Sequence, residues 1–250
     1  MAKEGQEAVA GTSKASPFDL SAFELENCTL EVRYPFALAL WDRSGQLWTA
    51  VQEKWPDITP TFVEPRKTDF QVGKNRLTVE FELARITTVD PGKSLDQFFL
   101  DAKDFIPIVT KHLHVTTFKR VGFRLIYFKE FKDKAEAADA FLALGLVRVP
   151  EGKKFEIDVK PINPHYGLRW ESEKKGVMLS ARTETRQINV EPSPEAARLM
   201  KPIHKQIDGM VVDVDYYTVS SVDPAQLDPA EWMRHAAHLV SRDTRYLFGE

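Results

Sequence analysis

The sequence has only one cysteine, Cys28, among its 250 residues. A single thiol cannot form an intramolecular disulfide, so the fold has to rest on a hydrophobic core. The N-terminus lacks a basic start followed by an apolar run, which argues against a secretory signal. No segment approaches the roughly 20 consecutive apolar residues that a membrane helix needs. These absences predict a cytoplasmic protein without a membrane partner.

An excess of charge of one sign is also absent, because 34 Lys and Arg residues face 37 Asp and Glu residues. This balance lacks the basic field that drives non-specific nucleic-acid binding, so it argues against a nucleic-acid partner without excluding one. The sequence contains no Walker loop, no Gly-x-Gly-x-x-Gly fingerprint and no Gly-x-Ser-x-Gly elbow. We therefore expect no cofactor.

Alternating apolar and polar residues predict the strands of a half-buried antiparallel sheet. The clearest runs are residues 77–83, 123–127, 166–170 and 212–216. The turn sequences Gly73-Lys74-Asn75 and Glu173-Lys174-Lys175-Gly176 each join two such runs, as in hairpins. The expected strands are residues 28–34, 60–72, 76–89, 115–131, 154–160, 166–172, 177–190 and 207–219.

Apolar stripes with helical spacing predict five helices, over residues 42–55, 94–112, 133–144, 194–204 and 223–246. Ser94 with Gln97, and Asp133 with Glu136, have the spacing of capping boxes. Pro107 is expected to kink or shorten the second helix. Three tryptophans recur every seven residues on one helical stripe and are expected in the core: Trp41, Trp48 and Trp55.

The order of these elements reads as two similar halves, each with a strand, a helix, several antiparallel strands and a long helix. We therefore predict an α+β fold in which helices pack on one face of an antiparallel sheet, after a disordered tail of residues 1–16. The halves would be residues 17–114 and 115–250, joined in one saddle-like sheet or each wrapped around its long helix. Duplication and a coincidence of common elements both remain open.

Three segments carry a resemblance to a known family. They are Phe70–Leu77, the strand end Val32-Arg33-Tyr34-Pro35, and Val212–Tyr217 with the following helix that contains Trp232 and His235. Over residues 26–248 the chain resembles a sporadically distributed family of bacterial proteins of about this length. That family has no established activity, so the resemblance implies a bacterial source, a cytoplasmic location and no recognised catalytic motif.

Paired carboxylates and paired histidines are the residues that could hold a metal. Asp213 and Asp215 point to one side of a strand, as carboxylates do in Mg²⁺ and Mn²⁺ sites, and His235 and His238 share one helix face. Nothing completes either set at a diagnostic spacing, so we favour no metal site. The alternative is a metal-dependent hydrolase or nuclease that uses these four residues.

The polar face of the predicted sheet gathers arginine and acidic residues. Arg124, Arg169 and Arg182 lie on three separate strands, all on the side away from the apolar residues. Such guanidinium groups either bind carboxylate or phosphate, or pair with carboxylates such as Glu171 and Glu184 across the strands. We expect at least two of the three to be paired and the third to be free for a partner.

The sequence therefore favours a non-catalytic bacterial binding or regulatory module. It would engage a protein partner or a small polar ligand through its antiparallel sheet. The expected partner is a protein encoded by a neighbouring gene. Nothing in the sequence identifies the ligand or the oligomeric state.

The tail hypothesis leads to a deletion experiment. Removal of residues 1–16, which carry almost no apolar surface, should change the free energy of unfolding by less than about 0.5 kcal/mol. Thermal and urea denaturation of the shortened and full-length chains measure this difference. A larger loss of stability would show that the tail packs on the body of the protein.

Overall fold

The computed structural model describes residues 20–64, 66–92, 94–148, 161–190 and 203–247. Its strands are β1 (Glu24–Arg33), β2 (Thr59–Glu64), β3 (Lys67–Val72), β4 (Asn75–Glu80), β5 (Leu83–Val89), β6 (Arg120–Phe131), β7 (His165–Glu171), β8 (Lys175–Val190) and β9 (Ile203–Thr218). Its α-helices are α1 (Ala39–Lys54), α2 (Asp96–Leu113), α3 (Lys134–Ala143) and α4 (Pro229–Leu247). The predicted tail and the predicted strand 154–160 lie outside the described residues.

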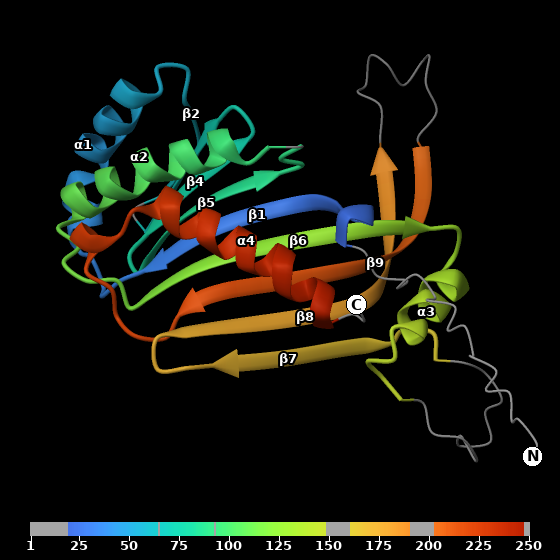
Figure 1. Cartoon of the computed structure of the whole chain (residues 1–250). Coiled ribbons are helices and arrows are strands. Elements are labelled where there is room, and N and C mark those ends of the chain that lie inside the picture. Colours follow the sequence, from blue (N-terminus) through green and yellow to red (C-terminus); the bar gives the residue numbers. More distant parts are fainter. Residues whose placement is uncertain (1–19, 65, 93, 149–160, 191–202, 248–250) are drawn as a thin grey trace, which may run out of the picture.

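All nine described strands belong to one antiparallel sheet, in the order β2-β3-β4-β5-β1-β6-β9-β8-β7. Helices α1, α2 and α4 lie on one face of this sheet, and α3 packs against β6, β8 and β9 (Figure 1). The predicted α+β class is therefore confirmed. None of the helices in the described ranges is long and apolar enough to cross a membrane.

The two halves of the chain have the same strand order. In the first half, β1 lies beside β5, followed outward by β4, β3 and β2, and in the second half β6 lies beside β9, followed by β8 and β7. The halves meet at the β1–β6 pair, and a single cluster of buried apolar side chains contains residues of both. This shared order is what the duplication hypothesis requires, while common ancestry itself stays a prediction.

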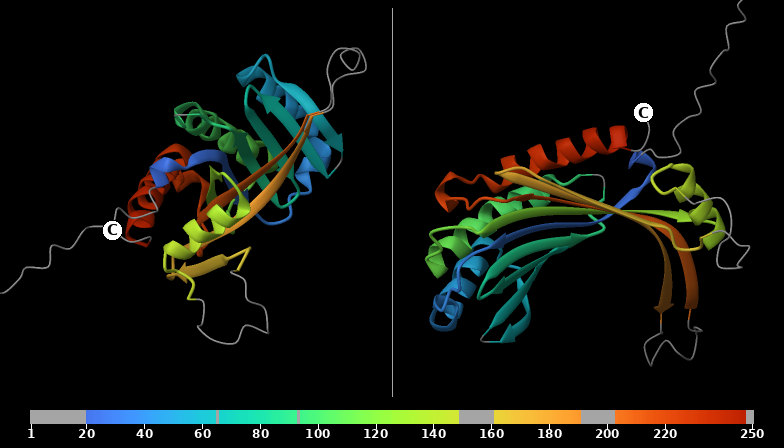
Figure 2. Two further views of the ribbon diagram at one scale, coloured as in Figure 1. Left: turned by 90° about the vertical axis from the view of Figure 1, so that its right-hand side faces the viewer. Right: turned by 90° about the horizontal axis from the view of Figure 1, so that it is seen from below.

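The sheet is strongly curved. Seen from below, its two ends bend away from α4, so that the helices lie on the outer side of an arch and the uncovered face is concave (Figure 2). The β8–β9 hairpin is longer than the other strands, with pairs running out to Val190 and Ile203, and it bends toward the concave side. The sheet thus presents a hollow, polar surface on the side that the helices leave open.

Two predicted strands are each divided in the structure. Residues 60–72 form β2 and β3, and residues 76–89 form β4 and β5. The second division is fixed by the segment that follows β1. The Tyr34 amide donates to Glu82 O at 2.9 Å, and the Ala37 amide donates to Phe81 O at 2.8 Å. Because these carbonyl groups bond outside the sheet, the ladder is interrupted there and a turn forms.

The ends of the helices agree only in part with the prediction. Asp133 accepts from the Glu136 amide at 2.9 Å, as expected, but Ser94 accepts from the Asp96 amide and not from Gln97. Helix α2 continues through Pro107 to Leu113, so the proline does not shorten it, and the kink stays a prediction. Pro107 is exposed, where water can satisfy the carbonyl that loses its helical partner.

The remaining corrections concern the tryptophan stripe and the short helix. Trp41 is 59% exposed, because the buried stripe of α1 runs one residue away, through Leu40, Leu47 and Val51. Trp48 and Trp55 are half-buried at the edge of that stripe. The predicted helix 194–204 lies mostly outside the described residues, and its last two positions already belong to β9.

The buried hydroxyl of Tyr34 offers a test of the turn between β4 and β5. It donates to Glu80 O and to Leu83 O, each at 2.8 Å. Tyr34→Phe leaves both carbonyl groups without this donor and should lower the free energy of unfolding by about 1–3 kcal/mol. Urea denaturation measures the loss. Tyr127→Phe is the control, because the Tyr127 hydroxyl has no hydrogen bond to a described residue and its removal should cost less.

Candidate functional site

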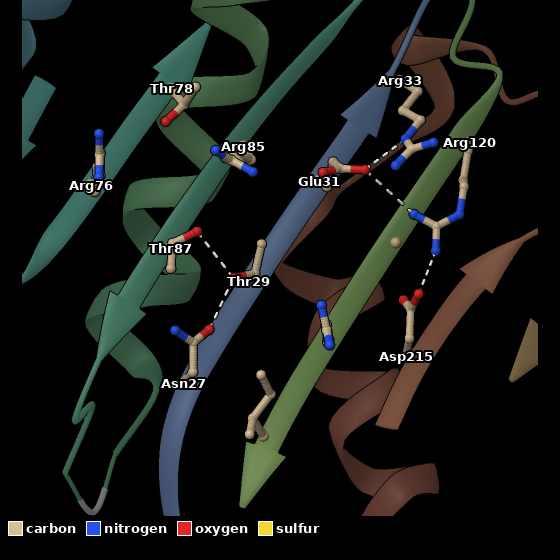
Figure 3. A pocket seen from close by; sticks show the side chains of 13 residues that line it. Asn27, Thr29, Glu31, Arg33, Arg76, Thr78, Arg85, Thr87, Arg120 and Asp215 are labelled. Carbon is tan, nitrogen blue, oxygen red and sulfur yellow. Dashed lines mark hydrogen bonds and ion pairs between the residues drawn. The ribbon is translucent and has the colours of Figure 1, made fainter. Parts of the chain in front are cut away.

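The concave face that the helices leave uncovered, called the open face here, contains a hollow of about 400 Å³. This central hollow lies over β4, β5, β1, β6 and β9, and Figure 3 shows most of its side chains. Alternation along the strands places polar residues there, while their neighbours enter the core. Its lining includes five arginines and two carboxylates: Arg33, Arg76, Arg85, Arg120, Arg124, Glu31 and Asp215.

A chain of ion pairs crosses the hollow (Figure 3). Arg33 Nε donates to Glu31 Oε1 at 2.7 Å, and Arg120 lies 3.7 Å from the same oxygen. Arg120 also donates to Asp215 Oδ2 at 2.5 Å. Burial raises the pKa of Asp215, and attraction to Arg120 and Arg124 offsets this only in part. Glu31 and Asp215 are therefore each already held by at least one guanidinium group.

The position of Arg120 depends on a glycine two residues further along β6. A Cβ atom at Gly122 would lie 2.5 Å from Arg120 Nη1, so a side chain there would displace the guanidinium group. The same group lies 4.7 Å from the centre of the Tyr217 ring, a cation–π geometry. Gly122 thus leaves the space in which Arg120 reaches both Glu31 and Asp215.

A second ion pair joins β6 to β9. Arg124 donates to both carboxylate oxygens of Asp213, with distances of 2.8 Å and 2.5 Å. Asp213 is only 5% exposed. The hydrogen bond that Arg124 donates to Asp213 raises the pKa of Arg124, so the guanidinium group is held firmly in its charged form. Arg124 therefore lines the hollow with its charge compensated.

A fourth carboxylate, Asp69 on β3, is fully buried beside the hollow. It accepts from Thr78 Oγ1 at 2.7 Å and from Arg76, and Lys67 lies 3.6 Å away. Burial raises the pKa of Asp69, but the hydrogen bonds from Thr78 and Arg76 and the charge of Lys67 outweigh it, so the pKa lies below its usual value. Arg76 is thereby compensated as well.

Arg85 on β5 differs from the other four arginines of the hollow. Its guanidinium group forms no hydrogen bond or ion pair with any residue in the described parts of the chain. In the strand register it lies between Glu31 on β1 and Thr78 on β4. Both neighbours are engaged, Glu31 by Arg33 and Arg120, and Thr78 by Asp69. A half-buried positive charge is therefore left uncompensated in the hollow.

Each of the three arginines singled out by the sequence has a carboxylate partner, although one was expected to be free. Arg124 bonds to Asp213, Arg169 to Glu171 at 2.5 Å, and Arg182 to Glu184 at 2.9 Å. The last two partners lie two residues along the same strand and not across it, because alternate residues share a face. Only Arg124 lines the central hollow.

The uncompensated residue, Arg85, was missed by the sequence interpretation, and so was Arg76. A signal for Arg85 was present, because it stands between Ala84 and Ile86, which are both buried. The same alternation that identified Arg124 therefore also places Arg85 on the polar face. The strand order could not be predicted from the sequence, and it determines which carboxylate lies next to each guanidinium group.

The residues of the alternative metal site are far from forming one cluster. Asp213 and Asp215 lie on the open face and bond to Arg124 and Arg120, whereas His235 and His238 are exposed on α4, on the helix-covered side. Within the described residues, no group of three or more His, Cys, Asp or Glu side chains is arranged to hold a metal ion. The sheet itself separates the carboxylates from these histidines.

The lowered pKa of Asp69 predicts a dependence of stability on pH. Because the folded pKa lies below the unfolded value near 3.8, the carboxylate stabilises the fold above that value and loses this effect as the pH falls through the folded pKa. The stability difference between the wild type and Asp69→Asn should therefore shrink between about pH 6 and about pH 3. Urea denaturation at several pH values measures it.

The matched control is Asp90→Asn, which removes an exposed carboxylate with an 84% exposed side chain. This substitution should change the free energy of unfolding little at either pH. A difference between wild type and Asp69→Asn that stays constant with pH would contradict the assigned role of Asp69.

Comparisons with known proteins give no family assignment. No family model matches the chain, and no curated protein matches it significantly. Membership of the sporadic bacterial family therefore stays a prediction. The interpretation of the open face has to rest on its geometry and charge.

Proposed function

We propose that the protein is a non-catalytic binding module whose open face takes up an anionic group, carried by a protein partner or by a small ligand, through its carboxylate or phosphate oxygens. The observation that carries this proposal is Arg85, a guanidinium group in the central hollow without a carboxylate partner among the described residues. The remaining charges of the hollow are paired, so Arg85 is where an incoming anion finds an open positive charge.

The physical chemistry of the hollow supports an oxyanion. A guanidinium group offers a planar fork of donors that matches two oxygens of a carboxylate or phosphate group. The surrounding walls of polar and charged side chains weaken an ion pair less than bulk water does. The volume of about 400 Å³ lies within the range of small-molecule sites. Thr78 and Thr87 lie on either side of Arg85, and their hydroxyl groups bond to Asp69 and Thr29.

The same geometry gives the alternative hydrolase little support. A general base needs a carboxylate or an imidazole that is free to accept a proton from substrate or water. In the hollow, Glu31 and Asp215 are both engaged by arginine, and Asp213 is engaged on both oxygens by Arg124. These ion pairs are better suited to holding a fixed arrangement of charge than to proton transfer.

The curvature of the sheet favours a protein as the bearer of the anionic group in the cell. The concave face and the β8–β9 hairpin bending toward it form a surface much broader than the central hollow (Figure 2). An aspartate or glutamate side chain of a partner would reach Arg85 while the rest of the partner contacts the arch. A neighbouring gene in a bacterial genome remains our expected source of such a partner, and the cytoplasm its expected location.

The role of Arg85 is tested by substitution and calorimetry. The full chain is titrated with inorganic phosphate and with citrate, and we expect binding of at least one of them by the wild type. Arg85→Gln should weaken that binding about tenfold or more, because a charge-assisted hydrogen bond contributes about 1.5–3 kcal/mol. Arg182→Gln is the control, since Arg182 lies on the same face but outside the central hollow.

Three results decide the proposal. Loss of binding in Arg85→Gln with unchanged binding in Arg182→Gln supports it. Equal affinity of the wild type and Arg85→Gln would remove Arg85 from the site. Absence of binding by the wild type to both probes, measured up to about 10 mM, would remove the proposal of a small-anion site.

A further inference from the structure

A second hollow of about 290 Å³ lies on the other, helix-covered side of the sheet. It is formed where the start of α2 meets the turn between β3 and β4 and the residue that follows α1, Trp55. Its inner wall consists of four buried side chains: Asn75, Thr88, Phe98 and Asp101. Lys74 and Ser94, both exposed, lie at its entrance. This hollow is called the α2 pocket below.

Asp101 gives the inner wall a negative charge without a matching cation. It is 5% exposed and accepts from Trp55 Nε1 at 3.2 Å, from Asn75 Nδ2 at 2.5 Å and from Gln97 Nε2 at 2.9 Å. All three donors are neutral, and no Lys, Arg or His of the described residues forms an ion pair with it. Neutral donors satisfy oxygen lone pairs but leave the carboxylate charge in place.

The entrance has the opposite charge. Lys74 Nζ bonds to Asp90 O at 2.9 Å and lies 3.6 Å from the Asp90 carboxylate, but the two side chains are 66% and 84% exposed. Such an exposed ion pair contributes little, so Lys74 can exchange it for another carboxylate at small cost. The Ser94 hydroxyl at the same entrance already donates to Asp96 Oδ2 at 2.8 Å, so Lys74 is the group there that can receive a carboxylate. The α2 pocket therefore has a buried carboxylate at its inner wall and an exchangeable cation, Lys74, at its mouth.

We infer that the α2 pocket binds a small zwitterion, an amino acid or a close analogue. Its ammonium group enters first and pairs with Asp101, whose charge is uncompensated and shielded from water. Its carboxylate group stays at the entrance, where Lys74 binds it. The Phe98 ring and the Trp55 ring, whose Nε1–H already points at Asp101, provide the apolar part of the wall. This site lies on the other side of the sheet from the central hollow and is independent of the proposed anion site.

Calorimetric titration of the full chain with a series of defined probes tests the inference. The probes are glycine, β-alanine and γ-aminobutyrate, which separate the two charges by increasing lengths, together with ethylamine and acetate. We expect one of the three zwitterions to bind, ethylamine to bind about tenfold more weakly, and acetate not to bind at this site. Asp101→Asn, which keeps the size of the side chain, should abolish binding of both the zwitterion and ethylamine.

The Lys74→Gln variant tests binding of the ligand's carboxylate end independently of its ammonium end. It should weaken the zwitterion to the level of ethylamine and leave the affinity for ethylamine unchanged. Lys103→Gln is the matched control, because Lys103 lies on α2 outside the pocket and pairs with Asp228 at 3.0 Å, and it should change neither affinity. If Asp101→Asn does not fold, the probe series and Lys74→Gln decide the question by themselves.

Three outcomes would overturn the inference. The first is that the wild type binds none of the zwitterions up to about 10 mM, which would leave Asp101 as a structural link between α1, β4 and α2. The second is that a folded Asp101→Asn variant keeps its affinity for the zwitterion. The third is that Lys74→Gln binds the zwitterion as tightly as the wild type does.

Discussion

The structure depends above all on the pairing of β1 with β6, the two central strands of the sheet. This pair joins the two halves of the chain, since Leu30 lies opposite Phe123 and Val32 lies opposite Val121, all four completely buried. The buried side chains face the helices, and the alternate residues of the same two strands face the central hollow. The register that buries the core therefore also determines which charges meet on the open face, because a slip by one residue would exchange the two faces.

Because one strand register determines both the core and the charge pairs of the open face, carboxylates can be buried close to the core. Asp69 and Asp213 are among the least exposed residues of the chain, and each is held by an arginine on a neighbouring strand. An unpaired buried charge is costly, so such pairs persist only where the register keeps both partners together. Among the described residues, Arg85 is the exception on the open face and Asp101 is the exception on the helix-covered side, and the two proposed sites lie at these two charges.

Much of the architecture could be predicted from the sequence, because it depends on local patterns. The alternation around Phe123 and Leu125 and the turn at Gly73 were sufficient to predict antiparallel strands and a hairpin. The order of elements was sufficient to suggest two similar halves. The divided strands were not predictable, because the turn at Phe81 and Glu82 is fixed by backbone bonds from residues more than 40 positions earlier.

The candidate sites were harder to predict, because they depend on contacts between residues that are far apart in the sequence. Arg169 and Arg182 have the carboxylate partners that were expected, Glu171 and Glu184, but these lie along the same strand and not across to a neighbouring one. The pairing of Arg124 with Asp213, and the lack of a partner for Arg85, depend on which strands are neighbours. No sequence pattern predicts the surroundings of Asp101, because its three hydrogen-bond donors come from a loop after α1, from β4 and from α2 itself.

Gly122 shows how a position without a side chain can control the charge of a surface. The space that it leaves on β6 is occupied by the Arg120 guanidinium group, which connects Glu31 with Asp215. An alanine at this position would push that group aside and leave two acidic side chains to compete for the remaining arginines. A mutational scan limited to ionisable residues would overlook this site, although a single methyl group here would redistribute the electrostatic potential across the three strands that carry Glu31, Arg120 and Asp215.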